Sequence, residues 1–258
     1  MVVVLALVVL AVLVVTLPAP ATLTPAASSP VAGVSPTTVS RVPTGPHPQP
    51  EEITFHGCPP GGDGTDPTLN RLKNRIDPVQ RPSPVGVADL LALSWPKSVD
   101  NRHMDDWAPA AQAQVARYDG VGLVLDGYLV RVAAEGAEST NCHSTAADEI
   151  DFHVWIAGGP GDARTAAVVV EFTPRLRAVH DGWTLKALQQ LARDKARVRV
   201  TGWLMLDPEH PEQLGKTRGT IWEIHPVTKI EVYQGGRWID LDTVGESGEF
   251  GESGETRG

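Results

Sequence analysis

IDFHVWIAGGPGDARTAAVVVEFTP, residues 150–174, contains two runs of alternating apolar and polar side chains joined by a turn-like segment. Strict alternation is typical of a β-strand with one buried face, and GGPGD has the composition of a turn. Symmetric pairing of the two runs places His153 opposite Glu171 and Trp155 opposite Val169. A shift of one residue would turn every apolar side chain to the wrong face, so the pattern favours this register.

The hairpin is expected to close a core with one face and to present the other face to a ligand. The apolar set comprises Phe152, Val154, Ile156, Val168, Val170 and Phe172. The polar set comprises Asp151, His153, Trp155, Glu171 and Thr173. We interpret the polar set as a candidate binding surface.

Three further strands are expected over residues 121–132, 198–206 and 219–233. The last is interrupted at His225-Pro226, because a proline within a strand implies a bulge or an edge. A helix over residues 184–195 is predicted from leucines at helical spacing. Its N-cap would be Asp181 or Thr184.

The predicted order, three strands followed by a helix and two strands, is that of the five-stranded OB-fold barrel. The fold class is therefore mainly β with short helices, preceded by an irregular, partly helical segment. In OB-folds, ligands lie across the second and third strands and between the loops that follow the first and fourth strands. Here both loops are polar and contain histidine.

Composition divides the chain into five parts. Residues 1–21 are a signal peptide or an N-terminal membrane anchor, and residues 22–50 a disordered linker rich in Pro, Ala and Thr. Residues 51–118 form the segment ahead of the barrel, which spans residues 119–242. Residues 243–258 are an acidic tail of Gly, Glu and Ser, expected to be disordered.

The N-terminus indicates export. Residues 2–17 are apolar apart from Thr16, a length that fits either the core of a signal peptide or a marginal membrane span. Ala19-Pro20-Ala21 offers a small-residue cleavage site, whereas no Lys or Arg precedes the apolar run. We expect an extracytoplasmic protein, secreted or held at the membrane through its N-terminus.

The formal net charge of −9 at pH 7 argues against general coating of nucleic acids, which requires a basic surface. Cys58 and Cys142 are the two cysteines of the sequence. In an exported protein they would form a disulfide, although free thiols and metal ligation stay open at this stage.

Several motifs resemble an uncharacterised family of exported bacterial proteins with an OB-like domain. They are CPP at 58–60, LNRLKNR at 69–75, DFH at 151–153, DPEHPEQLGKTR at 207–218 and WEIHP at 222–226. The resemblance covers roughly residues 55–233. It implies the fold and export, and it implies no established activity.

The hairpin offers the first candidate site. Asp151, His153 and Glu171 could bind a divalent metal ion that activates water, although their spacing matches no compact metal motif. The simpler alternative is a cross-strand pair of His153 and Glu171 without a ligand. Recognition of a ligand without chemistry is the third interpretation.

The loop between the fourth and fifth strands offers the second candidate site. Its residues are His210, Lys216 and Arg218, followed by Trp222, and Arg175 follows the third strand. Cationic groups beside an aromatic ring could bind an anionic or planar ligand. Alternatively, the loop is solvated and Trp222 belongs to the core.

These patterns favour a non-catalytic OB-fold binding module without a cofactor. Its ligand would be anionic or oligomeric, nucleic acid being one example, and would lie on the face of the second and third strands. The first alternative is a metal-dependent phosphodiesterase or nuclease that uses Asp151, His153 and Glu171. The second is a structural envelope protein that docks a protein partner.

Overall fold

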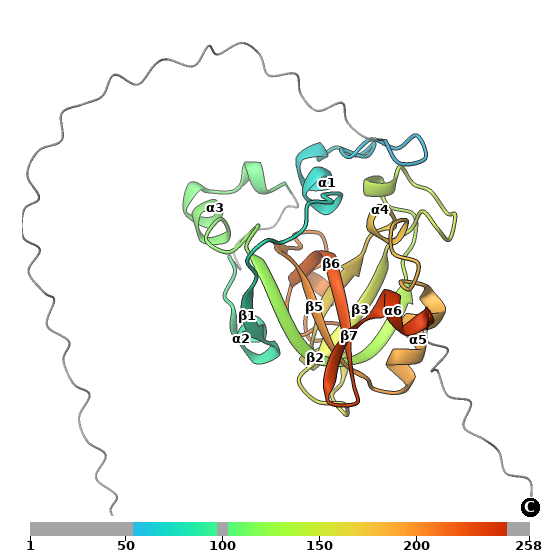
Figure 1. Ribbon diagram of the computed structural model, residues 1–258. Coiled ribbons are helices and arrows are strands. Elements are labelled where there is room, and N and C mark those ends of the chain that lie inside the picture. Colours follow the sequence, from blue (N-terminus) through green and yellow to red (C-terminus); the bar gives the residue numbers. More distant parts are fainter. Residues whose placement is uncertain (1–53, 97–102, 247–258) are drawn as a thin grey trace, which may run out of the picture. The chain divides into compact units, whose positions relative to one another are not determined.

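The computed structural model describes residues 54–96 and 103–246 (Figure 1). The expected signal peptide or anchor, the linker and most of the acidic tail therefore lie outside the described residues. No helix in the described part of the chain is long and apolar enough to cross a membrane.

The helices and strands alternate irregularly along the chain before the barrel begins at β2. In order they are α1 (Pro67–Lys73), β1 (Ser83–Gly86), α2 (Val87–Ala92), η1 (Met104–Asp106), α3 (Pro109–Val115), β2 (Gly122–Ala134), η2 (Ser139–Asn141), β3 (Phe152–Ala157), η3 (Arg164–Ala166), β4 (Ala167–Phe172), α4 (Pro174–Arg177), α5 (Leu185–Arg193), β5 (Arg197–Leu206), η4 (Pro211–Gln213), β6 (Trp222–Gln234), β7 (Arg237–Asp240) and α6 (Leu241–Glu246).

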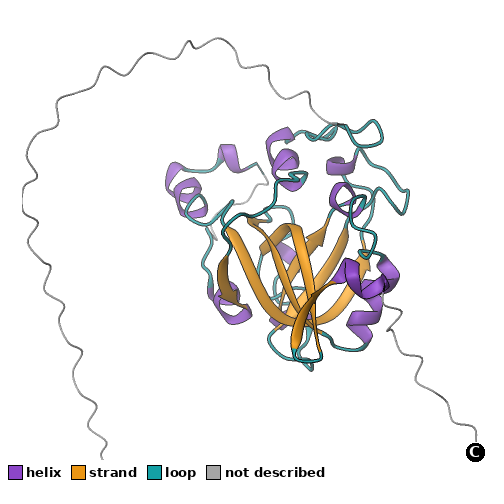
Figure 2. Cartoon of the chain, viewed as in Figure 1, coloured by secondary structure: helices purple, strands orange, loops and turns teal. Residues whose placement is uncertain are grey.

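Five strands close into a barrel in the order β2-β3-β4-β6-β5, because β5 pairs with β2 as well as with β6 (Figure 2). All neighbours are antiparallel except β4 and β6. Helix α5 lies between β4 and β5 in the sequence. The structure thus has the expected OB-fold order of strands and helix, and the fold prediction is confirmed.

The register predicted for the hairpin is also confirmed. His153 pairs with Glu171 and Trp155 with Val169. The apolar set of both strands lies in the main core, together with leucines and valines of β2 and β5. Helix α5 packs Leu188 and Leu191 into the same core, and the Thr184 side chain caps it by accepting a hydrogen bond from Ala187 N at 3.1 Å.

The bulge predicted at His225-Pro226 is present. The register between β5 and β6 shifts on either side of Gly202, which pairs with Val227, while Leu204 pairs with Ile224. A Cβ atom on Gly202 would lie 2.4 Å from the carbonyl oxygen of Pro226. The absence of a side chain at Gly202 therefore permits the close approach of the two strands where the bulge forms.

Two strands and two helices were not expected from the sequence. Strand β1 adds to β2 in parallel and β7 forms a hairpin with β6, so the sheet extends beyond the barrel. The short helices α4 and α6 were not predicted either. Strand β1 has only four residues and β7 follows the tight turn Gly235-Gly236, so neither gives a long alternating pattern.

The predicted disulfide between Cys58 and Cys142 is present. It joins the segment ahead of α1 to the loop between β2 and β3, across a sequence separation of 84 residues. In the chain-entropy model a loop of this length stabilises the fold by about 4 kcal/mol. The bond fixes one side of the covering layer that is described below.

Replacing Gly202 by alanine should destabilise the barrel by about 1–3 kcal/mol, because the new methyl group meets backbone atoms that cannot move independently. Urea unfolding followed by tryptophan fluorescence measures this loss. Gly136→Ala is the matched control, since a Cβ atom there meets nothing within 4 Å. Equal stability of the two variants would contradict the role assigned to Gly202.

Candidate functional site

The candidate site lies on the outer face of β3, β4 and β6. Alternation along each strand sends the apolar side chains into the barrel, so the intervening residues point outward. The outward residues with titratable side chains are His153 on β3, Glu171 on β4, and Glu223 and His225 on β6. Asp151 immediately precedes β3. In an OB-fold this is the usual ligand-binding face.

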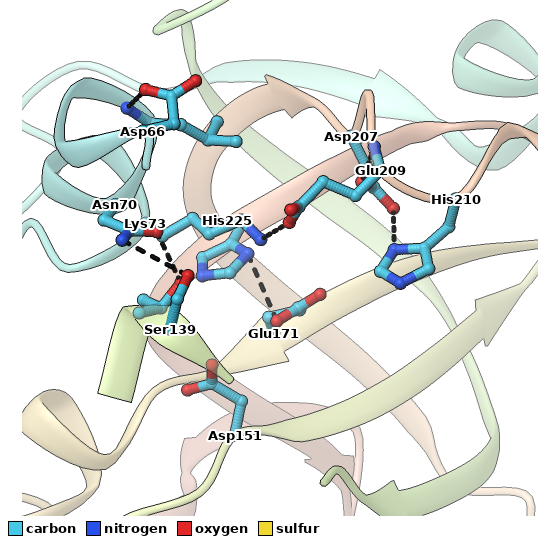
Figure 3. A network of polar contacts seen from close by, with 12 residues as sticks. Asp66, Asn70, Lys73, Ser139, Asp151, Glu171, Asp207, Glu209, His210 and His225 are labelled. Carbon is cyan, nitrogen blue, oxygen red and sulfur yellow. Dashed lines mark hydrogen bonds and ion pairs between the residues drawn. The ribbon is translucent and has the colours of Figure 1, made fainter. Parts of the chain in front are cut away.

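This face is covered rather than open, contrary to the expectation from sequence. Asp151 is 1% exposed, Glu171 4% and His225 1%. The cover consists of α1, the loop of residues 135–150 and the loop of residues 207–221, which surround the face in Figure 3.

Hydrogen bonds within the cover connect its segments to one another. Asn74 Nδ2 donates to Thr140 O at 2.8 Å, and Thr140 Oγ1 donates to Asn70 Oδ1 at 2.9 Å. Asn141 Nδ2 donates to Asp151 Oδ2 at 3.0 Å, which joins the cover to the site itself. The cover is therefore a built layer that holds the polar face away from solvent.

Glu171 lies between two histidines at the centre of the face. Its Oε1 atom is 2.6 Å from His153 Nε2, and its Oε2 atom is 3.2 Å from His225 Nδ1. The other nitrogen of His153, Nδ1, is 3.0 Å from Glu135 Oε1. Both carboxylate oxygens of Glu171 thus face imidazole nitrogens.

Three buried atoms beside Glu171 lack hydrogen bonds among the described residues. One is Oδ1 of Asp151, and the others are Nδ1 and Nε2 of His225, of which Nδ1 lies 3.2 Å from Glu171 Oε2. A buried polar group without a partner costs roughly 1–3 kcal/mol, so such groups call for a physical explanation. Asp151, Glu171 and His225 each offer a ligand atom, and these three atoms lie within 4.8 Å of one another.

A second group of donors lies on the other side of His153. Glu135, Glu138 and His153 also offer ligand atoms within 4.8 Å of one another. Both nitrogens of His153, however, already face carboxylate oxygens, and Glu135 is partly exposed. The group that contains Asp151 and His225 is therefore the better candidate for a metal site, because it has buried atoms without hydrogen bonds.

Arg218 neutralises the part of the face next to β6. It is fully buried, and its guanidinium is 2.7 Å from Asp207 Oδ2 and also pairs with Glu223. His210 Nδ1 lies 2.9 Å from the same oxygen of Asp207. Arg218 thus acts as a buried counterion for two carboxylates, while its Nε and Nη2 atoms have no hydrogen bond among the described residues.

Lys73 brings a second buried cation from α1. Its Nζ atom is 2.7 Å from Glu209 Oε2, and the side chain is 5% exposed (Figure 3). Helix α1 thus directs Lys73 into the acidic face. Nothing in the helical pattern distinguishes Lys73 from the solvated Arg71, so its burial could not be predicted.

The acidic surroundings shift the pKa values of the central groups. Burial and the neighbouring Glu171 raise the pKa of Asp151 to about 7. Burial alone would lower the pKa of His225, but Glu171, Glu223 and Asp151 together outweigh it and raise that pKa to about 10. Burial likewise opposes ionisation of Glu171, and yet His153 and His225 hold its pKa well below the usual value.

Most of the remaining predicted ligand-binding residues are buried or bonded to other parts of the chain. Trp155 is buried and its Nε1 donates to Thr217 O at 2.7 Å, and Arg175 donates to Cys58 O at 2.7 Å. Trp222 belongs to the core, as the alternative interpretation held. Lys216 is exposed and His210 half-buried, so these two positions are accessible.

The pKa shifts predict how the stability of the metal-free protein depends on pH. A group whose pKa rises on folding stabilises the fold below its unfolded pKa and loses that contribution as the pH passes its folded pKa. For His225 the change is from 6.5 to about 10, so the free energy of unfolding should fall across this window. Asp151 adds a fall of the same sign at lower pH.

Urea unfolding in the presence of a chelator measures this dependence. His225→Gln should flatten it, whereas His56→Gln, at a largely exposed position, should leave it unchanged. A stability that stays constant or rises from pH 6.5 towards pH 10 would show that His225 is not charged in the folded protein.

No protein-family model matches the chain, and no curated protein matches it. Solved structures similar to it include two engineered-binder complexes. "OBody AM2EP06 bound to hen egg-white lysozyme" is 16% identical, with 46% of this chain and 84% of that chain covered and a TM-score of 0.26. "OBody AM3L09 bound to hen egg-white lysozyme" is 16% identical, with 53% and 98% covered and a TM-score of 0.26. TM-scores this low support no conclusion, so the assignment of the OB-fold barrel rests on the observed order of the strands.

Proposed function

We propose that the protein is an extracytoplasmic metal-binding module, in which the covered face of the barrel holds one divalent transition-metal ion. The ligands are Asp151, Glu171 and His225. The observation that carries this proposal is the convergence of three buried donors, two of which have an atom without a hydrogen bond among the described residues.

The charges of the face support a bound cation. The acidic groups of the face and its rim are Glu135, Glu138, Asp151, Glu171, Asp207, Glu209 and Glu223. Within the described residues, the permanent cations in ion pairs with them are Lys73 and Arg218. Buried charges require compensation, and a divalent ion supplies it where two carboxylates and an imidazole meet.

The donor set favours a particular class of ion. Imidazole nitrogen together with carboxylate oxygen suits Zn²⁺, Mn²⁺ and Fe²⁺, whereas Mg²⁺ and Ca²⁺ prefer oxygen ligands alone. The groups behind the ligands fit as well. His153 contacts Glu171 and Asn141 donates to Asp151, and such outer contacts orient metal ligands in known sites.

Binding without turnover fits the burial of the site. None of the three ligands is more than 4% exposed, so a phosphodiester could not reach the ion unless the cover moved. The phosphodiesterase alternative is therefore less favoured than metal binding alone. A large anionic ligand on the same face is disfavoured for the same reason and because the face is acidic.

Export remains part of the proposal. It is supported by the apolar N-terminal stretch and by the disulfide, because disulfides persist in oxidising compartments.

The competing explanation is a metal-free polar layer in which protons and Lys73 balance the carboxylates. Isothermal titration calorimetry of the chelator-treated protein with Zn²⁺ and Mn²⁺, together with elemental analysis, separates the two. We expect one equivalent of ion and a raised melting temperature. Absence of saturable binding would favour the metal-free layer and contradict the proposal.

Three histidine variants test the assignment of ligands. His225→Gln should abolish binding, because it removes a ligand, whereas His153→Gln should weaken it by about 10–100-fold, because it removes only an outer contact. His180→Gln is the matched control, since His180 also pairs with a carboxylate, Asp242, at 2.6 Å but lies outside the site. Melting temperatures in chelator show whether each variant is folded.

A further inference from the structure

A row of aromatic and cationic side chains crosses the outer surface of β2, β5, β6 and β7, four strands that lie side by side (Figure 1). Tyr128 on β2 pairs with Arg197 on β5, and Tyr233 on β6 pairs with Trp238 on β7. Arg197 also lies 5.1 Å from the centre of the Tyr233 ring, which joins the two pairs. The four residues form what we call the aromatic row.

The row is accessible and its rings are held in place. Tyr233 is 40% exposed and the Arg197 side chain 45%. The Tyr233 and Trp238 rings are 5.0 Å apart, with 60° between their planes. Arg199 lies 4.3 Å and Arg197 5.3 Å from the centre of the Trp238 ring, so two guanidinium groups hold the indole in place. Exposed aromatic side chains gathered in one place mark interaction surfaces.

A second row, parallel to the first, is rich in carboxylates. Arg199 pairs in register with Asp126 on one side and with Glu231 on the other, and Glu231 pairs with Asp240. Asp126 accepts two hydrogen bonds from Arg199, at 2.6 and 2.9 Å. The surface beside the rings therefore offers both hydrogen-bond donors and hydrogen-bond acceptors, and it carries no excess of positive charge.

A cleft of about 330 Å³ adjoins this second row. Asp126 and Arg199 line it together with Asp89 on α2 and with residues of β1 and β2. This volume is at the lower end of the range for small-ligand pockets. Because Arg199 lies at the cleft and over Trp238, the cleft and the aromatic row form one continuous surface.

The chemistry of this surface selects among ligands. Nucleic acids stack on aromatic rings, but they need a basic groove, and here three carboxylates flank the rings. Neutral sugars present apolar faces to aromatic rings and hydroxyl groups to carboxylates and guanidinium groups. OB-folds bind oligosaccharides as well as oligonucleotides.

We propose that the aromatic row and its cleft bind a neutral oligosaccharide. The sugar rings stack on Tyr233 and Trp238, and Arg197, Asp126 and Arg199 bind their hydroxyl groups. This surface is separate from the covered metal face on β3, β4 and β6, so the proposal does not depend on metal binding.

The simpler explanation is that the row only holds β7 on the barrel. Titrations followed by tryptophan fluorescence distinguish the two, with hexasaccharides of glucose and of N-acetylglucosamine as probes and a thymidine hexanucleotide for comparison. We expect saturable binding of at least one hexasaccharide and weaker binding of the oligonucleotide. Absence of saturable binding of both sugars, or tighter binding of the oligonucleotide, would overturn the proposal.

Variants show whether the row is responsible. Trp238→Ala and Arg197→Gln should each weaken sugar binding by about tenfold or more, because each removes a stacking or hydrogen-bonding group. Trp203→Ala is the matched control. Trp203 lies on β5, like Arg197, but it is outside the aromatic row: it stacks against Arg75 at 3.6 Å and donates a hydrogen bond to Asp77 O. Affinity unchanged in Arg197→Gln and Trp238→Ala would overturn the assignment, whatever their stabilities.

Discussion

The burial of Glu171 between two histidines is the constraint on which this structure depends. A carboxylate on the outer face of a barrel would normally be solvated, but here it is 4% exposed, and each of its oxygens faces an imidazole. Such burial is costly unless the charge is compensated and the neighbouring groups are fixed. The disulfide, the hydrogen bonds of Asn74 and Asn141, and the buried Lys73 all belong to the layer that supplies this fixation.

The same constraint divides the surface of the barrel into two kinds of face. The face that OB-folds usually offer to long ligands is covered by the chain itself, so a polymer could not reach it unless the cover moved. On β5, β6 and β7, by contrast, aromatic rings and charged groups are accessible to solvent. A binding function of the barrel can therefore persist although its usual face is closed, since the strands provide a second surface.

Much of the fold could be predicted from sequence because the decisive signals are local. The alternation in β3 and β4 sets the register of His153 and Glu171, and Pro226 marks the bulge between β5 and β6. The covering layer could not be predicted, because it depends on contacts between distant segments, such as Lys73 with Glu209. For the same reason the sequence groups Asp151 and Glu171 with His153, whereas in the proposed metal site His225 takes the place of His153. In the WEIHP motif, Glu223 and His225 alternate with the core residues Trp222 and Ile224. This pattern alone could have predicted that both polar side chains face outward.

Anomalous X-ray diffraction from crystals grown with Zn²⁺, recorded on both sides of the zinc absorption edge, tests the metal centre most directly. We expect one strong anomalous peak under the cover, about 2.0–2.2 Å from a carboxylate oxygen of Asp151 and of Glu171 and from a nitrogen of His225. Peaks confined to exposed side chains, with no peak beside Glu171, would contradict it and would leave protons and Lys73 as the compensating charges.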